Sequence, residues 1–325
     1  MALRNTAPDD MAPGNTAPRN TDPRNTAPGN MELKGIYVPL ITPFDADGSV
    51  ALGALEKLSL EVLDDGAAGL VALGTTGEPA ALTAEERDAV VDVAAAVCAE
   101  RGAQLIVGAS GGDTRAVGEA LAALGARVPQ AAALVTTPAF VRAGEAGTIA
   151  HFRALAAASP LPLIVYHIPY RTGQQLSTAA LLELAAIDGV VGVKYATGGL
   201  DQSGVELLAA APADFAVLTG EDAFLAPMLA IGAAGGILAS AHLATGRFVE
   251  LCEAWRAGDV ERARALGHRL TGLALSAFTA PNPTVTKGVL HAQGRIPTPD
   301  VRLPLLPAGE AEVAAALAFA SGLDQ

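Results

Sequence analysis

The chain has 325 residues, of which 51% are hydrophobic, and its formal net charge is −13. This length suits one large domain or two ordinary ones, and the acidic excess argues against nucleic acid or an anionic membrane as a partner. Charges or glycines interrupt every apolar stretch before the ~18 residues that a membrane-spanning helix needs. The first thirty residues also lack the apolar core of a secretory signal. We therefore expect a cytoplasmic protein.

The N-terminal segment repeats the pattern Asn-Thr-x-Pro. The repeats start at Asn5, Asn15, Asn20 and Asn25. Because a segment rich in proline, asparagine and glycine buries too little apolar surface to fold, residues 1–30 are predicted to be a disordered tail. The folded part is expected to begin near Met31.

From that point, short apolar runs alternate with segments of helical spacing. The predicted strands are GIYVPL from Gly35, GLVALG from Gly69, QLIVGAS from Gln104, AALVT from Ala132, PLIVYH from Pro162, VVGVK from Val190, FAVLTG from Phe215 and GGILAS from Gly235. Nearly continuous apolar strands that alternate with helices indicate parallel strands covered on both faces. Eight such units favour an α/β fold, a (β/α)8 TIM barrel over residues 31–245.

Two further features complete this prediction. The helical stretches 246–279, 284–293 and 308–321 are expected to form a C-terminal helical extension over residues 246–325. An open doubly wound sheet is the alternative fold, and it is disfavoured because no Gly-x-Gly-x-x-Gly follows the first strand.

Functional groups of such barrels lie at the C-terminal ends of the strands. Lys194 ends the sixth strand and is one of only four lysines, against seventeen arginines. By itself, a lysine there is more typical of a side chain that reaches solvent or pairs with a carboxylate. The alternative is a desolvated amine whose pKa is lowered until it can act as a nucleophile.

Three other candidates lie at the same end of the predicted barrel. The turn Gly74-Thr75-Thr76-Gly77 follows the second strand, and its hydroxyls and N–H groups suit a small carboxylate. Tyr166, together with His167, ends the fifth strand and could transfer a proton, and Arg171 on the next loop offers a planar fork for a carboxylate. Each candidate has an alternative interpretation. The turn could be an ordinary glycine-rich turn, Tyr166 a core tyrosine and Arg171 a solvated arginine.

Several stretches resemble one protein family. They are GTTGEPAALTAEER, YHIPYRTG, GVKYATGGL, GEDA, NPTVTKGVL and RLPLLP, and they occur in the family's order. From about Met31 to the C-terminus, the chain resembles the dihydrodipicolinate synthase/N-acetylneuraminate lyase family, the class I pyruvate-dependent aldolases.

The resemblance implies a Schiff-base mechanism. Lys194 would attack the keto carbon of pyruvate, and the resulting enamine would add to an aldehyde or be released by aldol cleavage. Tyr166 would be the general acid and base, and Thr75 would assist it. Neither a metal ion nor an organic cofactor is expected, and the five histidines show no ligand spacing.

The same resemblance assigns the substrate-binding positions. Thr76, together with Thr75 and Gly74 of the turn, would hold the pyruvate carboxylate, and the main-chain carbonyl of Ile237 would face the keto acid. Arg171, in an Arg-Thr-Gly context, would grip the carboxylate of aspartate semialdehyde, which favours a synthase over a sialic-acid lyase.

One departure affects the second substrate. Phe140 stands where the synthases carry a tyrosine that reaches into a neighbouring subunit and completes a proton relay. The open alternatives are an aldolase for another 2-oxo acid, such as 4-hydroxy-2-oxoglutarate or a keto-deoxy sugar acid, and a catalytically retired barrel that binds a keto acid. A homo-oligomer, either a dimer or a tetramer, is expected.

Overall fold

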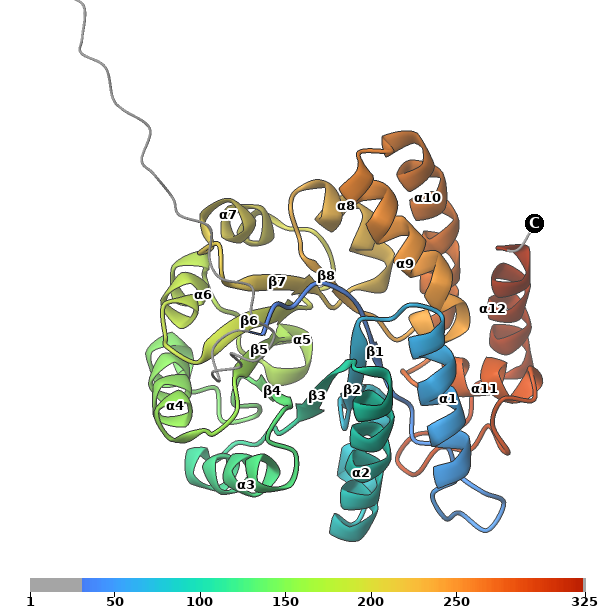
Figure 1. Cartoon of the computed structure of the whole chain (residues 1–325), viewed down its shortest axis with the longest axis horizontal. Helices are drawn as coiled ribbons and strands as arrows, with labels where there is room; N and C mark the ends of the chain where they lie inside the picture. Colours follow the sequence, from blue (N-terminus) through green and yellow to red (C-terminus); the bar gives the residue numbers. More distant parts are fainter. Residues whose placement is uncertain (1–30, 324–325) are drawn as a thin grey trace, which may run out of the picture.

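The computed structural model describes residues 31–323, and the predicted disordered tail over residues 1–30 lies outside the described residues. Within that range, eight parallel strands close into a barrel in chain order, with β1 pairing with both β2 and β8 (Figure 1). The strands are β1 Gly35–Pro39, β2 Gly69–Ala72, β3 Gln104–Gly108, β4 Ala132–Thr136, β5 Leu163–His167, β6 Val190–Tyr195, β7 Ala216–Thr219 and β8 Gly235–Ile237. Each coincides with one of the predicted strands, so the predicted (β/α)8 barrel is confirmed.

Helices surround the strands (Figure 1). Those between the strands are α1 Leu52–Asp64, α2 Ala84–Arg101, α3 Thr114–Arg127, α4 Gly144–Ala158, the short α5 Pro169–Thr172, α6 Thr178–Ala185, α7 Gln202–Ala210 and α8 Leu225–Ala230. After β8 come α9 Ala241–Ala257, α10 Val260–Ala277, α11 Thr284–Ala292 and α12 Glu310–Gly322. None of the helices within residues 31–323 is long and apolar enough to cross a membrane.

The predicted helical stretch 246–279 is wrong as one continuous unit. Gly258 ends α9 with a φ of 75°, a conformation that glycine adopts without steric cost. The side chain of Asp259 then caps α10 by accepting a hydrogen bond of 3.1 Å from the N–H of Arg262. Helix α9 is also kinked at Ala244 (φ −159°, ψ 49°), next to the predicted domain boundary after residue 245, and the division of the chain at that boundary stays a prediction.

The alternation of side chains along the strands determines which groups enter the barrel. On β6, Val193 and Tyr195 belong to the hydrophobic cluster between the strands and the outer helices. Because successive strand residues point to opposite faces, Lys194 between them faces the barrel interior. On β5, Val165 packs outward in the same way, and Tyr166 belongs to the interior cluster.

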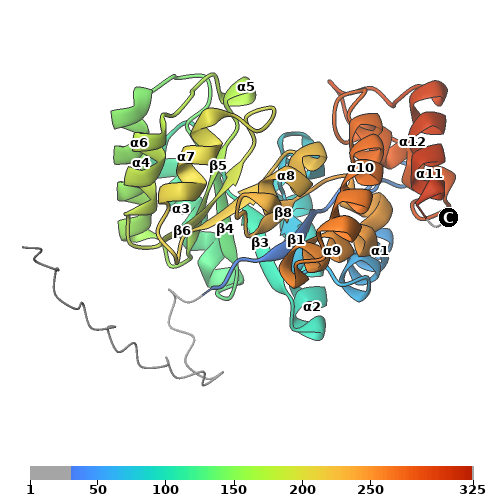
Figure 2. The same cartoon turned by 90° about the horizontal axis from the view of Figure 1, so that it is seen from above.

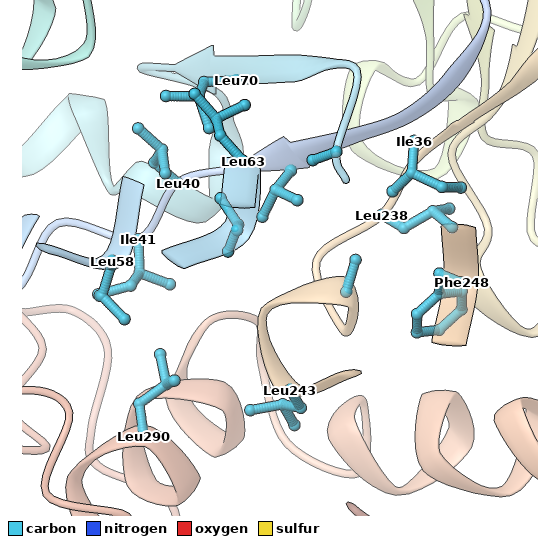
Figure 3. Close-up of a cluster of buried hydrophobic side chains, with 14 of the residues drawn as sticks. Ile36, Leu40, Ile41, Leu58, Leu63, Leu70, Leu238, Leu243, Phe248 and Leu290 are labelled. Atoms are coloured by element: carbon cyan, nitrogen blue, oxygen red, sulfur yellow. The ribbon is translucent and has the colours of Figure 1, made fainter. Parts of the chain in front are cut away.

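The C-terminal helices share a core with the barrel. Figure 2 shows α10, α11 and α12 together at one side of the molecule, next to α1 and α9. In Figure 3, Leu290 of α11 lies in one apolar cluster with Leu58 of α1 and Leu243 of α9. Leu290 is fully buried, and burial of such a side chain stabilises a fold by about 1.5–3 kcal/mol. The extension is therefore packed firmly enough to hold side chains against the barrel.

Candidate active site

A pocket opens at the C-terminal ends of the strands. Its lining comprises Pro39, Thr75, Thr76, Tyr166, Tyr170, Arg171, Lys194, Gly220, Asp222, Ile237, Ala239, Phe278 and Asn282. The structure thus brings together Lys194, Tyr166, Thr75, Thr76, Arg171 and Ile237 from the predicted set. Gly74 lies outside this lining and immediately precedes the turn that carries the two threonines. A wider hollow of about 350 Å³ lies near the N-terminal ends of β1 and β3, and the predicted residues are outside its lining.

Lys194 and Tyr166 lie side by side in the pocket lining. They are register partners on β6 and β5, and the Nζ atom of Lys194 lies 4.3 Å from the centre of the Tyr166 ring. The backbone of Gly220 passes close to the lysine, and a Cβ atom at this position would lie 2.8 Å from Lys194 Cε. A side chain at this position would therefore crowd both Lys194 and Ala196.

The two threonines lie on a short 3₁₀ turn, Thr75–Gly77. The N–H of Gly77 donates to the carbonyl of Gly74 at 2.9 Å, and Thr42 Oγ1 donates to the carbonyl of Gly77 at 2.7 Å. These bonds fix the turn at the mouth of the barrel, where its hydroxyls can meet a small carboxylate.

Two polar pocket residues were assigned no role by sequence reasoning. Asp222 accepts hydrogen bonds of 2.6 Å from both the N–H and the Oγ of Ser240, and its burial raises its pKa to about 6. Asn282 donates from Nδ2 to Thr76 Oγ1 at 2.9 Å, and its buried Oδ1 has no partner within residues 31–323. Both residues lie in stretches that resemble the family, Asp222 in GEDA and Asn282 in NPTVTKGVL. Local spacing, however, does not show that both side chains reach this pocket.

Lys287 is the second buried lysine, and it occupies a different place. Burial lowers its pKa to about 8. Its Nζ donates to Glu78 Oε1 at 2.6 Å and to the carbonyl of Asp300 at 2.8 Å. The amine is therefore engaged outside the pocket, whereas Lys194 faces into it.

Arg171 and Phe140 lie near the rim of the site. Helix α5 carries Arg171, whose Cζ atom lies 5.4 Å from the centre of the Tyr170 ring. Phe140 is 96% exposed and lies outside the pocket lining, and its N–H donates to the carbonyl of Thr172 at 3.4 Å. Among the residues that the structure describes, no group of three or more His, Cys, Asp or Glu side chains could hold a metal ion.

Comparison with known proteins shows to which family the chain belongs. Residues 32–320 match the model of the dihydrodipicolinate synthetase family. A 4-hydroxy-tetrahydrodipicolinate synthase from Moorella thermoacetica is 36% identical over 290 residues, which cover 88% of this chain and 98% of the relative. A 4-hydroxy-tetrahydrodipicolinate synthase from Neisseria meningitidis serogroup C is 36% identical over 288 residues, which cover 88% of this chain and 98% of the relative.

Solved structures of similar proteins have the same fold. Dihydrodipicolinate synthase DapA-2 from Bacillus anthracis superimposes with a TM-score of 0.84 at 30% identity, covering 90% of this chain and 99% of that one. The dihydrodipicolinate synthase from Acinetobacter baumannii was solved in complex with pyruvate. It superimposes with a TM-score of 0.84 at 33% identity, covering 89% of this chain and 99% of that one. The predicted family and the predicted class, a carbon–carbon lyase, are confirmed: the chain belongs to the dihydrodipicolinate synthetase family.

Proposed function

We propose that the pocket condenses pyruvate with an aldehyde through a Schiff base on Lys194. The observation that carries this proposal is the placement of the Lys194 amine 4.3 Å from the centre of the Tyr166 ring, in a pocket that two threonines also line. A nucleophile next to a proton-transferring group is the arrangement that covalent catalysis requires.

The chemistry follows from these positions. The neutral amine of Lys194 attacks the keto carbon of pyruvate and forms a carbinolamine. Tyr166 delivers a proton to the former keto oxygen, which leaves as water and gives the imine. Loss of a methyl proton gives an enamine, whose carbon attacks the aldehyde, and hydrolysis of the imine then releases the product. Thr75 and Thr76 hold the carboxylate, while Gly74 shapes their turn and the carbonyl of Ile237 faces the keto acid.

The second substrate is proposed to be aspartate semialdehyde. Arg171 at the pocket rim supplies a planar, permanently charged fork for the carboxylate that this aldehyde carries. Support comes from the relatives named 4-hydroxy-tetrahydrodipicolinate synthase and from the Acinetobacter baumannii structure with pyruvate. An aldolase for another 2-oxo acid is the second candidate, and Phe140 in place of the relay tyrosine is the observation that favours it.

We also propose that the chain forms a homo-oligomer, a dimer or a tetramer. Phe140 is 96%, Val141 58% and Tyr170 64% exposed, and Tyr170 also lines the pocket. Exposed aromatic and aliphatic side chains at the rim of a site are typical of a subunit contact. Sedimentation at micromolar concentration checks this, and a purely monomeric protein would contradict it.

Borohydride trapping tests the proposed chemistry. Reduction in the presence of pyruvate is expected to add one pyruvate-derived group, mapped to Lys194 by mass spectrometry of peptides. Lys194→Arg should abolish trapping and turnover, because arginine keeps the charge but stays protonated. Lys57→Arg, on the exposed face of α1, is the matched control and should behave as wild type. An adduct on Lys57 or Lys287 would reject the assignment, and a panel of aldehydes identifies the second substrate.

A further inference from the structure

The residue that follows the threonine turn has an unusual conformation and environment. Glu78 ends the turn in the left-handed region, with φ 53° and ψ 39°, where residues other than glycine are uncommon. Its side chain is 2% exposed. Oε1 accepts from Lys287 Nζ at 2.6 Å, and Oε2 accepts from the main-chain N–H of Arg302 at 2.9 Å. Both carboxylate oxygens are therefore bound by the segment that follows α10.

Lys287, like Glu78, is buried and makes several polar contacts. It lies on α11 and is fully buried. Besides Glu78, its Nζ contacts the carbonyl of Asp300 at 2.8 Å and lies 4.1 Å from the centre of the Phe44 ring. Burying two charges is costly unless their geometry and remaining hydrogen bonds compensate for the lost hydration. Here the ion pair, the hydrogen bond from the N–H of Arg302 and the Phe44 contact join the C-terminal extension to the loops at the barrel mouth, whereas the Asp300 contact lies within the extension.

A second contact joins the same two parts of the chain. Asn282, just before α11, donates from Nδ2 to Thr76 Oγ1 at 2.9 Å. Its Oδ1 is buried without a partner among residues 31–323, and the residue lines the pocket. The extension thus holds the turn at Thr76 and at Glu78, on both sides of Gly77.

We propose that the C-terminal extension positions the Thr75–Thr76 turn for the carboxylate of the 2-oxo acid, with Glu78 and Lys287 as the positioning residues. The inference rests on the proposed function, because the ligand of the turn is the carboxylate of pyruvate. The pair acts through the turn and lies outside the pocket lining, so its loss should weaken binding of the 2-oxo acid more than it slows the chemistry.

The test is the double substitution Glu78→Met/Lys287→Met, which leaves no unpaired buried charge. We expect KM for pyruvate to rise at least about tenfold and kcat to change less than about threefold, as for a loss of uniform binding. At saturating pyruvate, borohydride should still label Lys194 fully. The matched control is Arg153→Met/Glu183→Met, which removes an exposed ion pair of 2.6 Å between α4 and α6. It should leave both constants unchanged.

A folded double variant with unchanged KM would overturn the inference. If the double variant fails to fold, amide hydrogen exchange of the wild-type protein, measured with and without pyruvate, tests the inference instead. Pyruvate should then slow amide exchange in residues 74–78 and in residues 284–302 together, and protection of residues 74–78 alone would overturn the proposal. A wild-type protein that gives no adduct at Lys194 would instead reject the proposed function, so the two failures are distinguishable.

Discussion

Lys194 and Tyr166 face each other across the β5–β6 pairing, with the lysine Nζ 4.3 Å from the centre of the phenol ring. Their register partnership keeps both side chains on the interior face, because a slip of one residue would turn either of them outward. The distance between the proposed nucleophile and the proposed proton carrier is therefore set by the pairing of two strands rather than by a flexible loop.

Removing the phenol oxygen should slow the reaction strongly. Tyr166→Phe is expected to lower kcat by ~10²–10⁴-fold, the usual contribution of a positioned proton carrier. Tyr195→Phe is the matched control: its hydroxyl donates to Asp201 at 2.6 Å outside the pocket. That change should cost about 1 kcal/mol of stability and leave kcat near wild type. Steady-state kinetics checks both, and a Tyr166→Phe enzyme with near-normal kcat would contradict the assignment.

Arg171 should matter for the second substrate alone. Arg171→Ala is expected to raise KM for aspartate semialdehyde by roughly 10–100-fold, because a charge-assisted hydrogen bond contributes about 1.5–3 kcal/mol. Trapping of pyruvate on Lys194 should be unaffected. The exposed Arg142, whose side chain approaches Gly173 after α5, provides the control variant Arg142→Ala. Equal effects of the two variants would mean that Arg171 has no specific role.

Phe140→Tyr distinguishes the two candidate second substrates. If the protein acts on aspartate semialdehyde, the added hydroxyl should raise turnover, with Thr75 and Tyr166 of a neighbouring copy as its partners. This is the outcome we expect, because Arg171 supplies a site for the carboxylate of that aldehyde. If Phe140 instead belongs to an apolar acceptor site that a neighbouring copy buries, the unpaired hydroxyl should cost roughly 1–3 kcal/mol and lower native turnover. Assays against several aldehydes decide, and a loss of turnover with no gain on aspartate semialdehyde would exclude that substrate.

Asp222 should make stability depend on pH. Its pKa is raised by burial from 3.8 to about 6, so the folded state binds the proton more tightly than the unfolded chain. This contribution is therefore fully present below about pH 4 and is lost as the pH rises through about 6, by roughly 2–3 kcal/mol in total.

Urea unfolding between pH 4 and pH 7 measures this effect. The free energy of unfolding of wild type minus that of Asp222→Asn should fall across this window, because asparagine keeps an acceptor for Ser240 but does not titrate. Asp188→Asn, at an exposed position, serves as the control. A difference that stays constant with pH would show that Asp222 titrates normally.

Local sequence pattern was sufficient for the barrel and for the end at which its candidate site lies. Strands buried on both faces must be nearly continuously apolar, and helices of amphipathic spacing separate them, so each strand could be located from its own residues. Within the predicted barrel, Lys194 and Tyr166 are candidates because each lies at the C-terminal end of its strand. The break at Gly258 was missed, because apolar spacing continues across it and a glycine within such spacing does not by itself end a helix.

Only the tertiary structure brought the remaining groups together. Asn282 meets Thr76 over a separation of 206 residues, and Lys287 meets Glu78 over 209. No local period contains such contacts, because they depend on how the C-terminal helices pack against the barrel. The raised pKa of Asp222 and the lowered pKa of Lys287 likewise follow from burial, which is a property of the whole fold. The sequence therefore determined the scaffold and its likeness to a family, and packing decided which distant side chains support the threonine turn.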